Sequence, residues 1–248
     1  MSQKYFIPSE FKFQCIEIND EIANKLRNVM CNVMCHKDIS FDNIKTVIVN
    51  QNQYMFGVYQ NPFKSDELNL IVPRNISYDN NTKLWTIKYK SYLYQDYILL
   101  AYYDLVLNDK QLTYILNHES NHYINKDTGF PYYIFGTIYK LTTNPIVLLM
   151  SYYFGTIYMP LSCVVYNHLF AYNHKSIEKK ADLEFGTLDP SIRVAAADIW
   201  EYYSKIKIQY YTFIHKILYD IKDYYDTFIC GDTHPSCKER TEYLRLES

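Results

Sequence analysis

The sequence predicts an α+β protein that is mostly α-helical, with a small antiparallel sheet in its N-terminal part. Short runs rich in β-branched and aromatic residues fill residues 45–101, and apolar residues recur at helical spacing over residues 20–36 and again from residue 108 onward. The 248 residues contain no internal repeat and no low-complexity linker. We therefore expect a single domain, residues 1–248, that is long enough to bury a full hydrophobic core.

The expected N-terminal elements are a helix followed by strands. Residues 20–36 place five apolar side chains three and four residues apart, which predicts an amphipathic helix: Ile22, Leu26, Val29, Met30 and Val33. The strand-like runs that follow are TVIVN, YMFGVY, LNLIV, LWTIKYK and YILLAYY. Asn- and Asp-rich stretches such as residues 78–81 separate some of these runs and predict turns. A small, largely antiparallel sheet is the expected product.

Helices dominate the rest of the prediction. Asn108 is a typical capping residue, and Leu112 and Leu116 mark the buried face of the helix that follows it. A second helix is predicted over residues 175–186 (KSIEKKADLEFG). A third begins at an Asp-Pro pair and could extend over residues 190–225. The last segment, CGDTHPSCKERTEYL, is predicted to begin as a loop and to end as a helix.

The composition argues against some classes of protein. The net charge is −2 and charged residues make up 21% of the chain, so nucleic acid is not indicated as a partner. Six cysteines in 248 residues are too few for a disulfide framework. The N-terminal sequence MSQKYFIPSEFKFQ contains no apolar run of signal-peptide length. We therefore expect a reducing, intracellular compartment, the cytoplasm.

The strongest chemical signal is an H-E-x-x-H pattern on the helix after Asn108. Residues four apart lie on one helical face, so the imidazoles of His118 and His122 can reach one Zn²⁺. Glu119 follows the first ligand and can contact water at the ion without occupying the ion. Its carboxylate can take the proton of that water and pass it to the leaving amine. The pattern predicts a zinc hydrolase with Glu119 as the general base.

A catalytic zinc needs three protein ligands and one open position, so a third ligand is required. The predicted helix over residues 175–186 carries an E-x-x-x-D pair, Glu178 and Asp182, on one face. One of these carboxylates can bind the metal while the other accepts a hydrogen bond from a ligand imidazole. Combined with the two histidines, the pair completes a site with two imidazoles and one carboxylate.

These motifs together resemble the gluzincin metallopeptidases of the CAAX prenyl protease and HtpX type. HESNHYINKD is similar to the family's H-E-x-x-H-x-x-x-x-D, EKKAD to its E-x-x-A-D, and THPSCKERTEYL to its S/T-H-P-x-x-x-x-R-x-x-L. The resemblance covers residues 95–128 and 174–246. It implies a zincin-like fold with an active-site helix and a ligand helix, one Zn²⁺ per chain, and hydrolysis of peptide bonds.

The resemblance also implies roles for individual residues. Glu178 would be the third zinc ligand and Asp182 would support a ligand imidazole, with Asp127 as the trailing acid of the first motif. His234 and Arg240 would stabilise the oxyanion of the transition state. Residues 96–248 would form the catalytic core, while the N-terminal part, residues 1–95, resembles nothing in the family.

The chain departs from the family pattern inside the zinc-binding helix. The Leu-Gly pair that is usual between the two histidines is Ser120-Asn121 here. The usual small pair allows tight packing against this helix, and that expectation does not carry over to this chain. The departure does not affect a ligand, but it bears on how the neighbouring helix packs.

Residues 141–173 contain no Asp, Glu, Lys or Arg, and the membrane helices of HtpX-type proteins occupy the corresponding position. Two full spans need about 40 apolar residues and a turn. Pro145, Gly155 and Pro160 divide the stretch into shorter pieces. We expect an apolar helical hairpin that is packed within the fold or lies peripherally on a membrane surface. An integral membrane protease of the same chemistry is the alternative.

The sequence therefore predicts a zinc metalloendopeptidase acting on a peptide or protein substrate. The edge of a strand at residues 97–101 is expected to bind the substrate backbone by strand addition. A second alternative is a catalytically silent interaction protein that keeps zinc only for structure. The presence of Glu119 argues against that alternative, because a structural site has no use for a base beside an open position.

Overall fold

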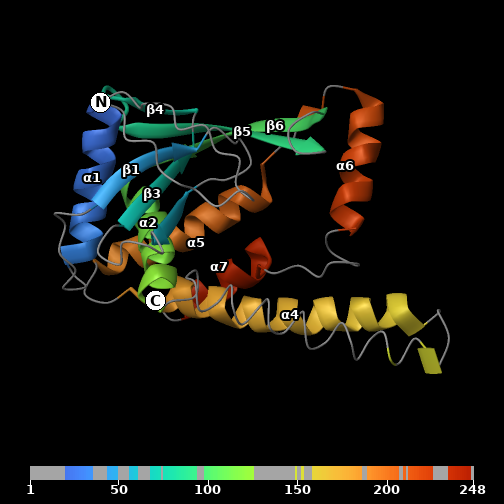
Figure 1. Cartoon of the computed structure of the whole chain (residues 1–248). Helices are drawn as coiled ribbons and strands as arrows, with labels where there is room; N and C mark the ends of the chain where they lie inside the picture. Colours follow the sequence, from blue (N-terminus) through green and yellow to red (C-terminus); the bar gives the residue numbers. More distant parts are fainter. Residues whose placement is uncertain are drawn as a thin grey trace, which may run out of the picture.

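The structure is a computed structural model of the whole chain (Figure 1). It describes the following residues, to which every structural statement below refers: 20–35, 44–49, 56–60, 68–73, 75–93, 98–125, 149, 152–153, 158–185, 189–206, 209–210, 212–225 and 234–246. Helices account for most of this part of the chain, and a small antiparallel sheet accompanies them. The α+β fold class, mostly α-helical, is confirmed.

The N-terminal helix, α1, spans Asp20–Cys35 as the apolar spacing predicts. Leu26, Met30 and Val33 are completely buried along its inner face. A three-stranded sheet follows, with β1 at Ile44–Val49, β2 at Gly57–Gln60 and β3 at Leu68–Pro73.

The first sheet is mixed, which corrects the expectation of antiparallel pairing. Its strand order is β1-β3-β2, so β3 lies between the other two strands. The pairing of β2 with β3 is antiparallel, whereas that of β1 with β3 is parallel. β3 runs in the opposite direction to β2 on one of its edges. Its other edge pairs with β1, which runs in the same direction as β3.

The second sheet is antiparallel and has the order β4-β5-β6-β7. Its strands are β4 (Ile76–Asp79), β5 (Leu84–Leu93), β6 (Ile98–Leu107) and the short β7 (Gln209–Tyr210). The predicted turn between β4 and β5 is present, and the Asp79 carboxylate accepts hydrogen bonds from the Asn81 amide at 2.9 Å and the Thr82 hydroxyl at 2.8 Å. β7 joins this sheet from a distant part of the chain.

Helix α2, Asp109–Ile124, follows β6 directly. Its predicted N-terminal cap is a full capping box, in which the Asn108 side chain accepts from the Gln111 amide and the Gln111 side chain accepts from the Asn108 amide, both at 2.9 Å. The buried Trp85 of β5 donates to the Asp109 carboxylate at 2.7 Å. The start of α2 is therefore fixed both by its own cap and by the second sheet.

The helix that carries Glu178 is longer than the sequence predicts. It is α4, Tyr158–Leu183, and it includes the second part of the apolar stretch, with Pro160 in its first turn, where proline is tolerated. In Figure 1 the N-terminal half of α4 extends beyond the other elements. The first part of the hairpin expected within residues 141–173, before Tyr158, lies largely outside the described residues. No described helix has both the length and the apolar character that crossing a membrane requires.

Three more helices complete the described chain. α5, Pro190–Ser204, starts at the predicted Asp-Pro pair, and the Asp189 side chain accepts from the Ser191 amide at 2.8 Å. It does not continue to residue 225, because the chain leaves it to form β7 before α6, Phe213–Tyr225. α7, Cys237–Leu246, is the predicted C-terminal helix.

One cluster of buried side chains connects these elements. It draws on α1, both sheets, α2, α5 and α7, with members such as Leu70, Ile87, Leu112, Ile199 and Leu244. Burial of this apolar surface is the main force that holds the elements together. The second half of α2 lies against this core on one side and near the end of α4 on the other. That position brings its polar residues toward α4 and α7.

Candidate metal centre

His118 and His122 lie one turn apart on the buried face of α2, with 7% and 6% of their surfaces exposed. Their rings meet edge to face with centroids 4.6 Å apart, and their Nε2 atoms are separated by 3.1 Å. Both imidazoles therefore direct the same nitrogen to one point, as the spacing of four residues predicts.

Glu178 of α4 reaches the same point. Its Oε2 lies 3.3 Å from Nε2 of His118, and its Oε1 lies 3.2 Å from Nε2 of His122. Burial alone would raise the pKa of Glu178, but hydrogen bonds from the two imidazoles outweigh burial and hold the pKa well below its usual range. The carboxylate is therefore ionised, as a metal ligand has to be.

These three side chains lie close enough together to hold one metal ion. Potential ligand atoms of His118, His122 and Glu178 all lie within 4.8 Å of one another. A tetrahedral ion bound at about 2.0–2.1 Å separates its ligand atoms by about 3.3 Å. The separations of 3.1, 3.2 and 3.3 Å come close to that value. The group is thus able to hold a metal ion with these three ligands.

Asp182 supports the first histidine, as the E-x-x-x-D spacing predicts for the second carboxylate. Its Oδ1 lies 2.8 Å from Nδ1 of His118, on the ring edge opposite the converging Nε2. Burial would raise the pKa of Asp182, but the charge of His118 and the hydrogen bond to it lower the pKa. At this distance Asp182 can stabilise a proton on Nδ1, which would leave the lone pair of Nε2 for a metal ion.

Arg240 of α7 connects the two carboxylates of α4. One terminal nitrogen, Nη2, donates to Oε2 of Glu178 at 2.8 Å, and the other, Nη1, donates to Oδ1 of Asp182 at 3.1 Å. Only 3% of the arginine is exposed, and its guanidinium lies 4.2 Å from the ring centre of Trp200. With both terminal nitrogens occupied in this way, Arg240 is placed to position the ligand carboxylate. This geometry does not favour the oxyanion role that the motif implies.

Glu119 lies on α2 between the two histidines and is partly buried. Burial raises its pKa, and the charges of His118 and His122 counteract part of that rise. A carboxylate with a raised pKa is a stronger base than a free glutamate, which suits the predicted role.

His234 and Asp127 belong to the outer part of the predicted site. His234 precedes α7 with 62% of its side chain exposed, and its Nε2 lies 3.7 Å from Oε1 of Glu178. It is therefore beside the metal position and open to solvent, where a substrate could meet it. Asp127 lies outside the described residues.

Two tyrosines and a tryptophan complete the site, and the sequence analysis did not identify them. Tyr114 donates to Oδ1 of Asp182 at 2.6 Å, and Tyr243 donates to the other carboxylate oxygen. The indole of Trp200 donates to the Tyr114 hydroxyl at 2.7 Å. Tyr114 lies one helical turn before His118, so the rule that residues four apart share a face could have found it. Nothing local to Trp200 or Tyr243 marks them.

Two imidazoles of α2 and a carboxylate of α4 therefore form a buried group that could bind a metal ion, and residues of α5 and α7 contact this group or its partners. Comparison of the chain with protein-family models, with curated proteins and with solved structures finds no match. The assignment of a function thus depends on the site itself.

Proposed function

We propose that this protein is a zinc-dependent metallopeptidase with a zincin-like fold, as its resemblance to the CAAX prenyl protease and HtpX type implies. The observation that carries the proposal is the convergence of His118, His122 and Glu178 within 4.8 Å, with Glu119 between the two histidines in the chain. Imidazole and carboxylate ligands in this number are typical of catalytic zinc sites, which leave one position open.

The chain supplies the other parts of a hydrolytic reaction. A bound zinc ion supplies a Lewis acid and an acidified water. Glu119 would accept a proton from the attacking water and deliver it to the leaving amine. His234, exposed beside Glu178, donates a hydrogen bond to the oxygen that becomes negative when the peptide carbonyl is attacked. Asp182 and Arg240 hold His118 and Glu178 in place during these steps.

The substrate backbone is proposed to bind along the edge of β6 that faces away from β5. Residues 97–101 were expected to provide this edge, but Ala101 is paired with Tyr210 of β7 and Tyr102 with Gln209. In the described part of the chain no strand pairs with this edge from Asp104 to Leu107. An extended peptide can therefore add to that part of the edge, which leads directly into α2.

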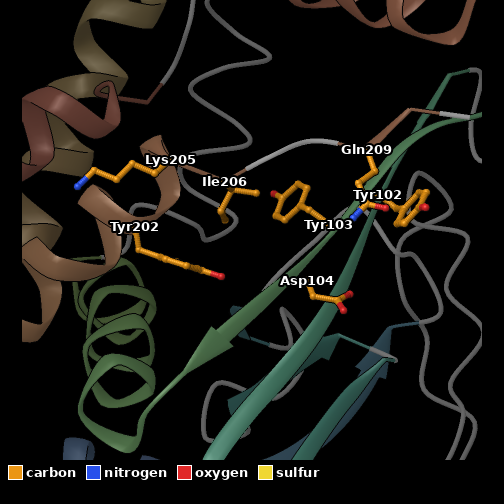
Figure 2. Close-up of a pocket in the computed structure, with 7 residues that line it drawn as sticks. All are labelled: Tyr102, Tyr103, Asp104, Tyr202, Lys205, Ile206 and Gln209. Atoms are coloured by element: carbon orange, nitrogen blue, oxygen red, sulfur yellow. The ribbon is translucent and has the colours of Figure 1, made fainter. Parts of the chain in front are cut away.

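A pocket of about 310 Å³ opens beside the same edge and is a candidate for a substrate side chain. Figure 2 shows Tyr103 of β6 pointing toward Ile206, with Tyr202 approaching from the end of α5. The lining side chains combine aromatic rings with hydroxyl groups. Asp104 and Lys205 also line the pocket, and its size suits a bulky side chain of the substrate better than a small one.

Exchange of Glu119 tests the proposed function most directly. Glu119→Gln is nearly isosteric but cannot accept the proton, so turnover of a peptide library should fall by roughly 10²–10⁴ while zinc content stays at about one ion per chain. Glu201→Gln is the matched control, because Glu201 is a glutamate on α5 paired with the surface residues Lys205 and Arg245. Its activity should equal that of the wild type.

Two results would contradict the proposal. If the wild type binds zinc but hydrolyses no member of the library, the site is a structural zinc centre of an interaction protein. If Glu119→Gln turns peptides over as fast as the wild type, the base is another residue.

A further inference from the structure

Helix α2 carries a row of asparagines, Asn117, Asn121 and Asn125, spaced four residues apart. The first two are buried, with 0% and 2% of their surfaces exposed. Asparagine is a poor residue for a helix interior, and a buried amide is unfavourable unless it is hydrogen-bonded. The proposed reaction gives these buried amides no role.

The two buried amides bind the C-terminal end of α4. Nδ2 of Asn121 donates to the main-chain oxygens of Ala181 at 2.7 Å and Glu184 at 2.8 Å. Nδ2 of Asn117 donates to the Glu184 oxygen as well, at 2.9 Å. The last carbonyls of a helix have no amide partner within the helix. Side chains of α2 therefore provide the cap of α4.

The position of this cap relates it to the metal centre. Asn117 and Asn121 directly precede His118 and His122 along α2. On α4, Ala181 directly precedes Asp182 and lies three residues, nearly one turn, after Glu178. The bond from Asn121 to Ala181 thus joins the two helices within one turn of the proposed ligands, and the bonds to Glu184 lie directly after the end of α4.

Such a joint restricts both sliding and rotation of α4 against α2. The two amides bond to the carbonyl of Ala181, in the last turn of α4, and to that of Glu184, directly after the helix, so a shift of this end of α4 in either direction lengthens at least one bond. Metal sites tolerate deviations of only about 0.2 Å in ligand distance. Because the amides bond to main-chain oxygens, they fix the backbone of α4 beside Asp182 and nearly one turn after Glu178. The position of this backbone does not depend on a side-chain rotamer of α4.

We propose that Asn121, assisted by Asn117, is a positioning residue that sets the distance between the histidines of α2 and the carboxylates of α4 and thereby the affinity and geometry of the metal site. The proposal depends on the metal site of the proposed function. It also explains why Ser120-Asn121 can replace the Leu-Gly pair of the family pattern. The polar side chain at position 121 forms the contact that close packing against glycine would otherwise provide.

The test compares metal binding in Asn121→Ala and Asn117→Ala with two controls. Asn125→Ala removes an asparagine of the same row, whose side-chain amide bonds, among the described residues, to the side chains of Glu184 at 2.8 Å and Lys180 at 3.1 Å. Ile87→Val lowers stability by removing a methylene group from a buried residue of β5. Zinc affinity is measured by competition with a chelator. The visible spectrum of the cobalt-loaded protein reports the coordination geometry, and the melting temperature of the metal-free protein reports stability.

Asn121→Ala should weaken zinc binding by roughly 10–100-fold, the usual range for residues that support metal ligands, and should change the cobalt spectrum. Asn117→Ala loses only one bond to the shared Glu184 oxygen and should give a smaller change in the same direction. It also serves as the readout if Asn121→Ala does not fold. Asn125→Ala and Ile87→Val should keep the wild-type affinity and spectrum even where the melting temperature falls.

Wild-type affinity and an unchanged cobalt spectrum in both buried-asparagine variants would overturn the inference, because the amides would then serve stability alone. That outcome leaves the proposed function intact, since the wild type still binds zinc. Absence of zinc binding in the wild type itself would instead refute the proposed function, and the inference with it.

Discussion

Replacement of Asp182 by asparagine tests the network that holds the metal ligands. The Asp182 carboxylate is completely buried and serves four groups. It faces Nδ1 of His118 at 2.8 Å, accepts from Tyr114 at 2.6 Å and from Arg240 at 3.1 Å, and accepts from Tyr243 on its second oxygen. An amide keeps the shape but removes the charge, and it turns one acceptor into a donor that faces another donor.

The contacts of Asp182 indicate how much stability and zinc affinity the Asp182→Asn variant should lose. Removal of one partner from a buried ion pair costs about 3–5 kcal/mol of unfolding free energy. Arg240 retains its second carboxylate, Glu178 at 2.8 Å, so we expect the lower end, about 3 kcal/mol. Loss of the carboxylate that orients His118 should weaken zinc binding by roughly 10–100-fold without abolishing it.

The assays are urea denaturation of the metal-free protein and zinc titration against a competing chelator. Asp198→Asn is the matched control, because Asp198 is an exposed residue of α5 whose ion pair with Arg245 spans 3.8 Å. An exposed pair contributes less than about 1 kcal/mol, so the control should change neither quantity by more than that. A wild-type zinc affinity in Asp182→Asn would refute the reasoning, because it would mean that Asp182 does not orient the ligand.

Three further predictions follow from the same geometry. His122→Ala should lose nearly all zinc in elemental analysis, whereas the wild type should hold about one ion per chain; full retention in the variant would exclude His122 as a ligand. His234→Ala and His234→Phe should both lower kcat by roughly 10²–10³ in steady-state kinetics with little change in zinc content, because His234 is exposed beside Glu178 and not among the converging ligands. Loss of zinc from either variant would make His234 a ligand. In the metal-free protein burial lowers the pKa of His118, but the charge of Asp182 and hydrogen bonds to Asp182 and Glu178 raise it to about 10. Because the pKa of an unfolded histidine is about 6.5, this stabilisation is complete below that pH and is lost as pH rises toward 10. Urea denaturation of the metal-free protein across this range should show the loss, and His118→Gln should remove it.

The sequence by itself determined the features that depend on near neighbours in the chain. The cap at Asn108 follows from its residue type, and the two histidines on one face of α2 and the two carboxylates on one face of α4 follow from helical periodicity. This geometry is set within four residues, so a linear pattern is enough to predict it. The turn at residues 78–81 was predictable for the same reason, since the Asp79 side chain organises its own loop.

Strand pairing and helix lengths needed the tertiary structure. The parallel pairing of β1 with β3 and the addition of β7 to β6 join segments whose separation in the chain is not encoded in either strand. The alternation of apolar residues is the same in parallel and antiparallel strands, so it does not choose a partner. The extension of α4 back to Tyr158 was obscured by Pro160, which is compatible with a helix only because it falls in the first turn.

The role of Arg240 was also decided only by tertiary packing. Its motif associates it with the oxyanion, whereas α7 brings it against Glu178 and Asp182, about 60 residues earlier in the chain. In the same way the amide of Asn121 finds its partners at Ala181 and Glu184. A sequence pattern specifies what a side chain can bind, but which group it meets depends on how the hydrophobic core sets the helices against one another.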